Sequence, residues 1–143
     1  MCIRDSKKDI ENIYHNDVLV ASIIRPLQSK DGLSFFTHDD NFIQVGVWNY
    51  EAGEKLPAHY HTEFERKAYK TNESVLVLKG EIICNLYTES GNLIKKLVIN
   101  EGEMIAQFNE AHEYIIQKDS IVVETKNGPY FGPDKDRVRI DTK

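Results

Sequence analysis

The feature that most constrains the fold is a succession of short apolar runs separated by turn residues, with no long helical periodicity. Runs that recur about every eight to ten residues favour an antiparallel sandwich or barrel. Residues 7–16 are the exception: Ile10 and Ile13 lie three positions apart, which favours a weak short helix or a frayed lead-in. We therefore predict an all-β protein with strands at residues 17–25, 33–37, 42–50, 74–79, 81–87, 94–99, 104–108, 113–117, 121–126 and 138–140.

Two histidines two positions apart, His59 and His61, follow a turn at residues 51–54. Side chains alternate across a strand with a period of two, so a strand here would point both imidazoles to one face. A lone histidine is more often structural than a ligand, and His15 and His38 are interpreted in that way. The pair at His59 and His61 is instead interpreted as two ligands of one metal ion.

Two further residues extend this candidate metal site. Glu73 precedes one apolar run and His112 opens another, so neighbouring strands would bring both side chains into the barrel. Imidazoles and carboxylates are the ligands of many transition-metal sites. Glu63 and Glu65 compete with Glu73 because both are nearer to His61, but a rigid strand places a ligand more accurately than a loop. The alternative for His112 is a pocket histidine that binds substrate.

The spacing around these residues resembles a known family. Gly53-x5-His59-x-His61 is similar to the start of the first cupin motif, and Glu73-x6-Gly80 is similar to its end. The resemblance implies a single-domain cupin, a double-stranded β-helix or jelly-roll barrel, over residues 7–143. It also implies one divalent transition metal, Fe, Mn, Ni or Zn, held by His59, His61, Glu73 and His112.

Segments outside the motif resemble one subgroup, small cupin-fold metalloproteins often encoded among surface-polysaccharide biosynthesis genes. These segments are Phe35-Phe36-Thr37, Thr71-Asn72-Glu73 and Glu124-x3-Gly128-Pro129-Tyr130. The chain departs from the family in two places. Residues 62–72 form a longer insert than the usual motif has, and the second motif survives only as Gly102 and His112.

The insert at residues 62–72 has two interpretations of equal weight. Loops beside a rigid site often carry specificity, so it could be a lid over the metal. It could equally be a solvated excursion on the surface. Two roles are also possible for Trp48 and Tyr50: they could form an aromatic wall of the cavity, or they could be core residues.

A metal held in this way could polarise a carbonyl and an adjacent hydroxyl, which is sugar isomerase or epimerase chemistry. The small-molecule ligand would then be a sugar or sugar nucleotide. The base would be Tyr114, which shares the facing of His112, or else Glu63 or Glu65. The alternatives are an iron-dependent dioxygenase and a non-catalytic sensor that binds a metabolite.

Composition limits the classes of binding partner that we expect. The net charge is −5 and basic residues do not cluster, so we expect no nucleic acid partner. The longest apolar run, Val18–Ile24, is too short to span a bilayer, so we expect no membrane insertion. That run could extend a neighbouring subunit's sheet, which favours a homodimer. Cys84 lies within an apolar run and is interpreted as a small buried hydrophobe, which fits a reducing cytoplasm.

The first six residues, Met-Cys-Ile-Arg-Asp-Ser, match the peptide that translation of a transposon adapter from a sequencing library would give. We therefore expect residues 1–6 to be a sequencing artefact and the native N-terminus to be missing. They are left out of the fold prediction.

Overall fold

The computed structural model describes residues 8–143, so the expectation for residues 1–6 lies outside the described residues. The described chain is all-β, as predicted, and every strand pairing in it is antiparallel. Its strands are β1 Ile10–His15, β2 Val18–Ile24, β3 Gly32–Phe35, β4 Gly46–Asn49, β5 Glu73–Lys79, β6 Glu81–Tyr87, β7 Leu93–Asn100, β8 Met104–Gln107, β9 Ala111–Ile116 and β10 Ile121–Lys126.

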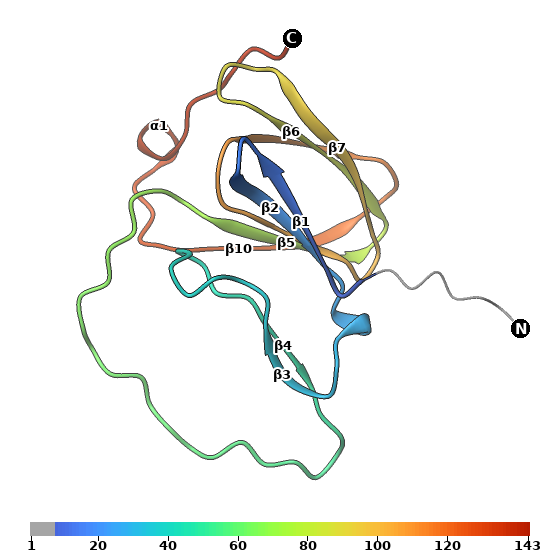
Figure 1. The fold of residues 1–143 in the computed structure, drawn as a ribbon, viewed down its shortest axis with the longest axis vertical. Helices are drawn as coiled ribbons and strands as arrows, with labels where there is room; N and C mark the ends of the chain where they lie inside the picture. The colour runs from blue at the N-terminus through green and yellow to red at the C-terminus, as the bar shows by residue number, and fades with distance from the viewer. Residues whose placement is uncertain (1–7) are drawn as a thin grey trace, which may run out of the picture.

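The strands form two facing sheets and a separate hairpin (Figure 1). The five-stranded sheet has the order β1-β2-β8-β5-β10, and the three-stranded sheet has the order β7-β6-β9. Strands β3 and β4 pair only with each other in the described chain. The 3-10 turn Pro26–Gln28 joins β2 to this hairpin. Pro26 has no N–H to donate to a strand ladder, which is why β2 ends before it.

One apolar core fills the space between the two sheets. Val77 and Ile105 contribute from the five-stranded sheet, and Ile82 and Leu86 from the three-stranded sheet. Their burial is nearly complete, and each buried aliphatic side chain contributes about 1.5–3 kcal/mol. Cys84 lies in the same core with no exposed surface, and burial raises its pKa to about 12, as its interpretation as a buried hydrophobe predicts.

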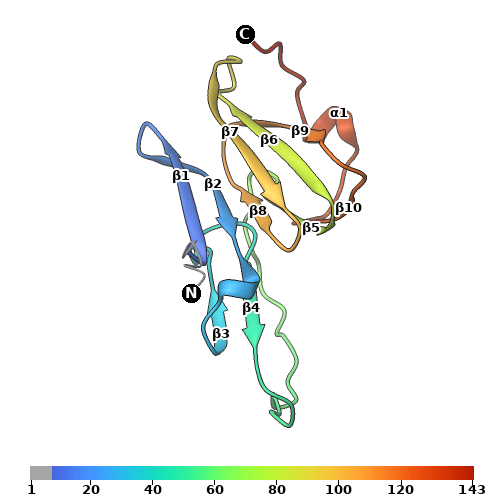
Figure 2. The same cartoon turned by 90° about the vertical axis from the view of Figure 1, so that its right-hand side faces the viewer.

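The β3–β4 hairpin packs by its base against the outer face of the five-stranded sheet and then extends beyond it (Figure 2). Val45 meets Ile24 and Ala106 at this contact. The opposite face of the hairpin is left in solvent. Trp48 is 66% exposed and Tyr50 is 40% exposed, so neither the cavity wall nor the core proposed for them is formed.

Three predictions of secondary structure are wrong. Residues 7–16 contain β1 rather than a helix, because Asn16 and Asp17 adopt φ of 48° and 62° and turn the chain back to pair with β2. Residues 138–140 form no strand. The tail turns at α1, Pro133–Asp136, and its last residue, Lys143, donates its N–H to the Gly91 carbonyl oxygen. The strand expected around His59 and His61 is also absent from the described chain.

No helix in residues 8–143 has both the length and the apolar character needed to cross a bilayer.

The position of β2 changes the argument for a homodimer. Both edges of β2 are paired, one with β1 and the other with β8. Ala21–Ile24 are paired on both sides, so β2 is not a free sheet edge and that route to a dimer is wrong. The homodimer itself stays a prediction.

Candidate metal and ligand site

Glu73 and His112 meet at one end of the core. His112 Nε2 donates to Glu73 Oε1 over 2.9 Å. Glu73 is the first residue of β5 in the five-stranded sheet, and His112 is the second residue of β9 in the three-stranded sheet. The contact therefore joins the two sheets. The side chain of Glu73 is 12% exposed and that of His112 is 34% exposed, so the pair lies where the core opens to solvent.

Strand register explains why these side chains turn inward. His112 lies opposite Leu86, and Tyr114 lies opposite Cys84, both of which belong to the buried face of β6. Because side chains alternate along β9, His112 and Tyr114 share that inward face, as the sequence predicts. Glu73 shares its face of β5 with buried Val75.

Tyr114 links the carboxylate to the core. Its hydroxyl donates to Glu73 Oε1 over 3.4 Å and accepts from Gln107 Nε2 over 2.5 Å. Burial raises the pKa of Tyr114 above its ordinary range, and the nearby Cys84 and Glu73 raise it further. The phenol therefore keeps its proton and acts here as a donor to Glu73.

Gln107 is a polar side chain at a buried position, with 4% of its surface exposed. Its Nε2 also donates to Cys84 Sγ over 3.6 Å. Its Oε1 has no hydrogen-bond partner among the described residues. A buried amide oxygen without a partner costs about 1–3 kcal/mol, so the site tolerates an unsatisfied acceptor.

Two carboxyl groups share this end of the core. Burial by itself would raise the pKa of Glu73, but the hydrogen bond and charge of His112 outweigh burial and the pKa is lowered. Glu124 on β10, opposite Val75, has a raised pKa, first because it hydrogen-bonds with Glu73 and then because it is partly buried. His112 thus favours the ionised form of Glu73, whereas the Glu73 carboxylate makes Glu124 easier to protonate than an isolated glutamate.

His59 and His61 lie elsewhere. They belong to the loop of residues 50–72, which leaves β4, extends away from both sheets and returns at β5 (Figure 1). Their ring centroids are 5.1 Å apart, and His59 Nδ1 lies 3.0 Å from the Pro57 carbonyl oxygen. Glu63 and Glu65 are exposed in the same loop. The structure thus brings Glu73, His112 and Tyr114 together and leaves the other four predicted site residues outside.

The donor atoms fit a transition metal in type but not in placement. Glu73 and His112 supply one carboxylate and one imidazole, which is half of the predicted set. Within residues 8–143, no three His, Cys, Asp or Glu side chains gather closely enough to hold a metal ion. The predicted ligands therefore lie in two separate places, Glu73 and His112 between the sheets and His59 and His61 on the loop.

Sequence analysis missed two residues of this cluster, Gln107 and Glu124. The signal for both is a polar side chain on the apolar face of a strand. Gln107 alternates with buried Ile105, and Glu124 alternates with Val122, which packs on the core. A buried polar residue such as Gln107 needs a partner inside, whereas Glu124 is exposed and joins the cluster through its hydrogen bond with Glu73.

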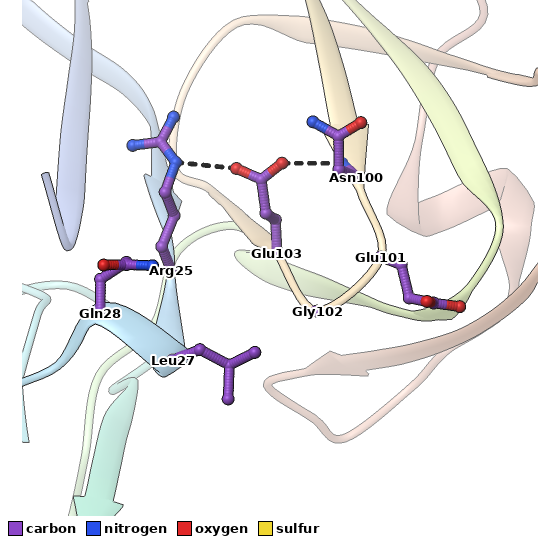
Figure 3. A pocket seen from close by; sticks show the side chains of 7 residues that line it. All are labelled: Arg25, Leu27, Gln28, Asn100, Glu101, Gly102 and Glu103. Carbon is purple, nitrogen blue, oxygen red and sulfur yellow. Dashed lines mark hydrogen bonds and ion pairs between the residues drawn. The ribbon is translucent and has the colours of Figure 1, made fainter. Parts of the chain in front are cut away.

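A cavity of about 340 Å³ lies at the other end of the core, beside Arg25 and Glu103 (Figure 3). Arg25 Nε donates to Glu103 Oε2 over 2.8 Å, and its Nη2 donates to Glu11 Oε2 over 3.0 Å. Arg25 Nη1 donates to the Lys8 carbonyl oxygen over 2.9 Å, and Glu103 Oε1 accepts from the Asn100 N–H over 3.0 Å. Each of these charged groups already has its partners, so the cluster is a structural one.

No protein-family model, curated protein or solved structure matches this chain. The cupin resemblance therefore rests only on the motif residues and the sequence segments quoted above. What the site can do follows from its donor atoms and their surroundings.

Proposed function

We propose that this protein is a cupin-type metalloprotein whose divalent transition metal lies at the Glu73–His112 pair. The observation that carries the proposal is the 2.9 Å contact between these two side chains, one from each sheet. An imidazole and an ionised carboxylate at the mouth of an apolar core are the start of a metal site. His59 and His61 would supply the remaining protein ligands.

The surroundings of the pair support this assignment. A ligating carboxylate is usually held by a further hydrogen bond, and the Tyr114 hydroxyl donates one to Glu73. The lowered pKa of Glu73 keeps its carboxylate ionised, as a ligand must be. An ordinary structural ion pair would have little reason to leave the Gln107 Oε1 beside it without a partner.

The proposed ligand is a small sugar or sugar nucleotide, and the proposed reaction is an isomerisation or epimerisation. A bound divalent ion supplies Lewis-acid polarisation of a carbonyl and its neighbouring hydroxyl. Tyr114 would hold a proton at its Oη beside the ligand. Glu63 and Glu65 are the candidate bases, because they are carried on the same loop as the missing histidines.

Metal content tests the first half of the proposal. Elemental analysis of protein purified without chelators should show about one transition-metal ion per chain. The double variant His59→Ala/His61→Ala and the single variant His112→Ala should each lose most of it, whereas His38→Ala, an exposed histidine outside the site, should keep it. Full occupancy in the double variant and in His112→Ala would overturn the site.

Proton exchange tests the second half. Enolisation next to a carbonyl exchanges one carbon-bound proton with solvent, so proton NMR in D2O should show loss of that signal from a turned-over sugar nucleotide. The exchange should require the metal and disappear in Glu73→Gln. A ligand that binds the metal-loaded protein without any exchange would identify a sensor instead.

A further inference from the structure

We propose that a pocket on the outer face of the five-stranded sheet binds a single pyranose ring. The pocket has a volume of about 160 Å³ and is lined by residues of two loops, one before β4 and one before β5, and by the residues that follow β8. The side chains that carry the proposal are Asp40, Asn41, Phe42, Tyr69, Lys70 and Phe108. This site goes beyond the proposed function, because none of these residues belongs to the proposed metal site.

The pocket lies on the other side of the sheet from the Glu73–His112 pair. Phe108, which lines it, belongs to the apolar cluster that the β3–β4 hairpin covers. Phe108 directly follows Gln107, whose side chain points to the inner cluster. Neighbouring residues of an extended chain turn to opposite faces, so the pocket and the inner cluster share backbone but no side chain.

Two aromatic side chains form one wall of the pocket. The ring centroids of Phe42 and Tyr69 are 5.9 Å apart, and the ring planes meet at 70°. Phe42 is half-buried, whereas Tyr69 is 81% exposed. The Tyr69 ring is thus apolar surface at the edge of a pocket, and a ligand that packs its C–H groups against it removes that surface from water.

Two charged side chains in the pocket have unused hydrogen-bonding capacity. Lys70 Nζ donates to Asn109 Oδ1 over 3.2 Å and forms no ion pair among the described residues, so two of its three donors are available. The exposed Asp40 carboxylate also forms no ion pair within residues 8–143. The pocket therefore offers a ligand both a donor and an acceptor.

Asn41 adds a donor beneath the surface. Its Nδ2 is buried and has no hydrogen-bond partner among the described residues. Its backbone carbonyl accepts from Gln44 Nε2 over 2.9 Å, so the residue itself is held in place. A buried donor without a partner is destabilising, and rotation about the Cβ–Cγ bond would turn this one toward an acceptor in the pocket.

These groups together favour a hydroxylated ring. A hydroxyl both donates and accepts, so neighbouring hydroxyls can donate to Asp40 and accept from Lys70 or Asn41. The C–H face of the ring would then pack on Tyr69. Pockets for drug-sized ligands are about 300–1,000 Å³, so this smaller one suits a single ring, and anything attached to the ring would lie outside.

The pocket keeps its shape without a ligand. The Phe42 N–H donates to Asn72 Oδ1 over 3.2 Å, and Asn72 Nδ2 donates to the Phe108 carbonyl oxygen over 3.1 Å. Asn72 thus fastens the loop before β4 and the loop before β5 to the end of β8. A preformed pocket spares the ligand the entropic cost of ordering these loops.

Amide chemical shifts measured by NMR test the site, in chelator-treated protein so that the result does not depend on metal. The probes are the methyl pyranosides of glucose, galactose, mannose and rhamnose. We expect at least one of them to shift the amides of Asn41, Phe42 and Asn109 in a saturable way. Gly102 lines the other cavity and is the reference amide, which should not shift.

Two pairs of variants locate the ligand. Tyr69→Ala should weaken binding about tenfold or more, because it removes the packing surface, whereas Tyr60→Ala, 84% exposed in the same loop, should not. Asp40→Ala should weaken binding about threefold or more, because it removes the acceptor, whereas Asp39→Ala next to it should not. All four side chains are exposed, so each variant should fold.

The outcomes decide the proposal. If none of the four pyranosides shifts the pocket amides, or if the control variants weaken binding as much as their partners do, the site is overturned. If benzoate shifts these amides and no pyranoside does, the pocket binds a planar aromatic acid and the sugar assignment is overturned.

A comparison of two glucosides identifies the source of the ring. Uridine diphosphate glucose that binds more tightly than methyl glucoside would support a sugar nucleotide, and equal binding would support a free sugar or the end of a glycan. Binding must also persist in His112→Ala, because its loss there would place the ligand at the inner cluster and overturn this site. Failure of pyranoside binding leaves the metal proposal standing, and absence of metal leaves this site standing.

Discussion

Two charged clusters lie at opposite ends of β8, and they differ in how completely they are paired. Glu103, immediately before the strand, is joined to Arg25, which also binds Glu11 and a backbone carbonyl. At the other end, Gln107 has an acceptor without a partner, and His112 beside it is one third exposed. One strand thus separates a closed cluster from an open one.

The difference shows how a buried charge can be used. A buried ion pair whose members have all their hydrogen bonds adds little chemistry, because no group is left to bind a ligand. A cluster with an ionised carboxylate, a histidine that reaches solvent and an unsatisfied amide has spare capacity for one. The predictions below test whether the first cluster is structural and the second is functional.

Arg25→Met should have the largest effect. It leaves Glu103 ionised and buried without its partner, and breaking such a pair costs about 3–5 kcal/mol of the free energy of unfolding. Denaturant unfolding measures the loss. Lys95→Met is the control, since Lys95 is half exposed and 3.7 Å from Glu11, and it should change stability by less than about 1 kcal/mol. Equal losses in both variants would show that the Arg25 cluster is not a structural centre.

Gly80→Ala should lower the free energy of unfolding by about 2–3 kcal/mol, because two effects add. Gly80 has a φ of 93°, which costs an alanine about 1–2 kcal/mol, and a new Cβ would collide with the Asp119 carbonyl oxygen. Gly53→Ala isolates the first effect, because Gly53 has a φ of 98° and open space around it, so its cost should be only about 1–2 kcal/mol. A cost at Gly53 as large as that at Gly80 would mean that the open loop is packed against something.

If the proposed metal site is correct, Glu73→Gln should weaken metal binding at least tenfold, equivalent to about 1.4 kcal/mol, because it removes the proposed charged ligand on β5. Glu63→Gln and Glu65→Gln should leave the affinity nearly unchanged. Titration with a competing chelator measures all three. Should Glu65→Gln strip the metal while Glu73→Gln does not, the loop supplies the carboxylate and the assignment is reversed.

The smallest effect is a dependence on pH at the closed cluster. The hydrogen bond from Arg25 lowers the pKa of Glu11 below its ordinary value of about 4.3, so the pair stabilises the fold above that pH. That contribution is lost as pH falls through the lowered pKa. The Glu11 side chain is 41% exposed, so solvent screening keeps the contribution below about 1 kcal/mol. Glu11→Gln should therefore flatten the stability curve slightly below pH 4, and a difference that persists unchanged into strong acid would contradict this origin.

Local patterns in the sequence were enough for most of the strands. β6 and β10 lie where the apolar runs place them, and β2, β5, β7 and β8 differ only at their ends. The same alternation correctly placed His112 and Tyr114 on one inward face of β9. These predictions succeed because the alternation of apolar and polar residues within a strand indicates which of its faces is buried.

Only the tertiary structure decided which strands pair and which predicted ligands meet. Alternation with a period of two places His59 and His61 on one face only if these residues form a strand paired with a neighbour. In the described chain they pair with no strand. Gln107 and Glu124 joined the cluster because β8 and β10 flank β5, a relation between segments far apart in sequence. Sequence spacing determines the facing of a side chain, whereas contact between side chains depends on backbone pairing that no local pattern encodes.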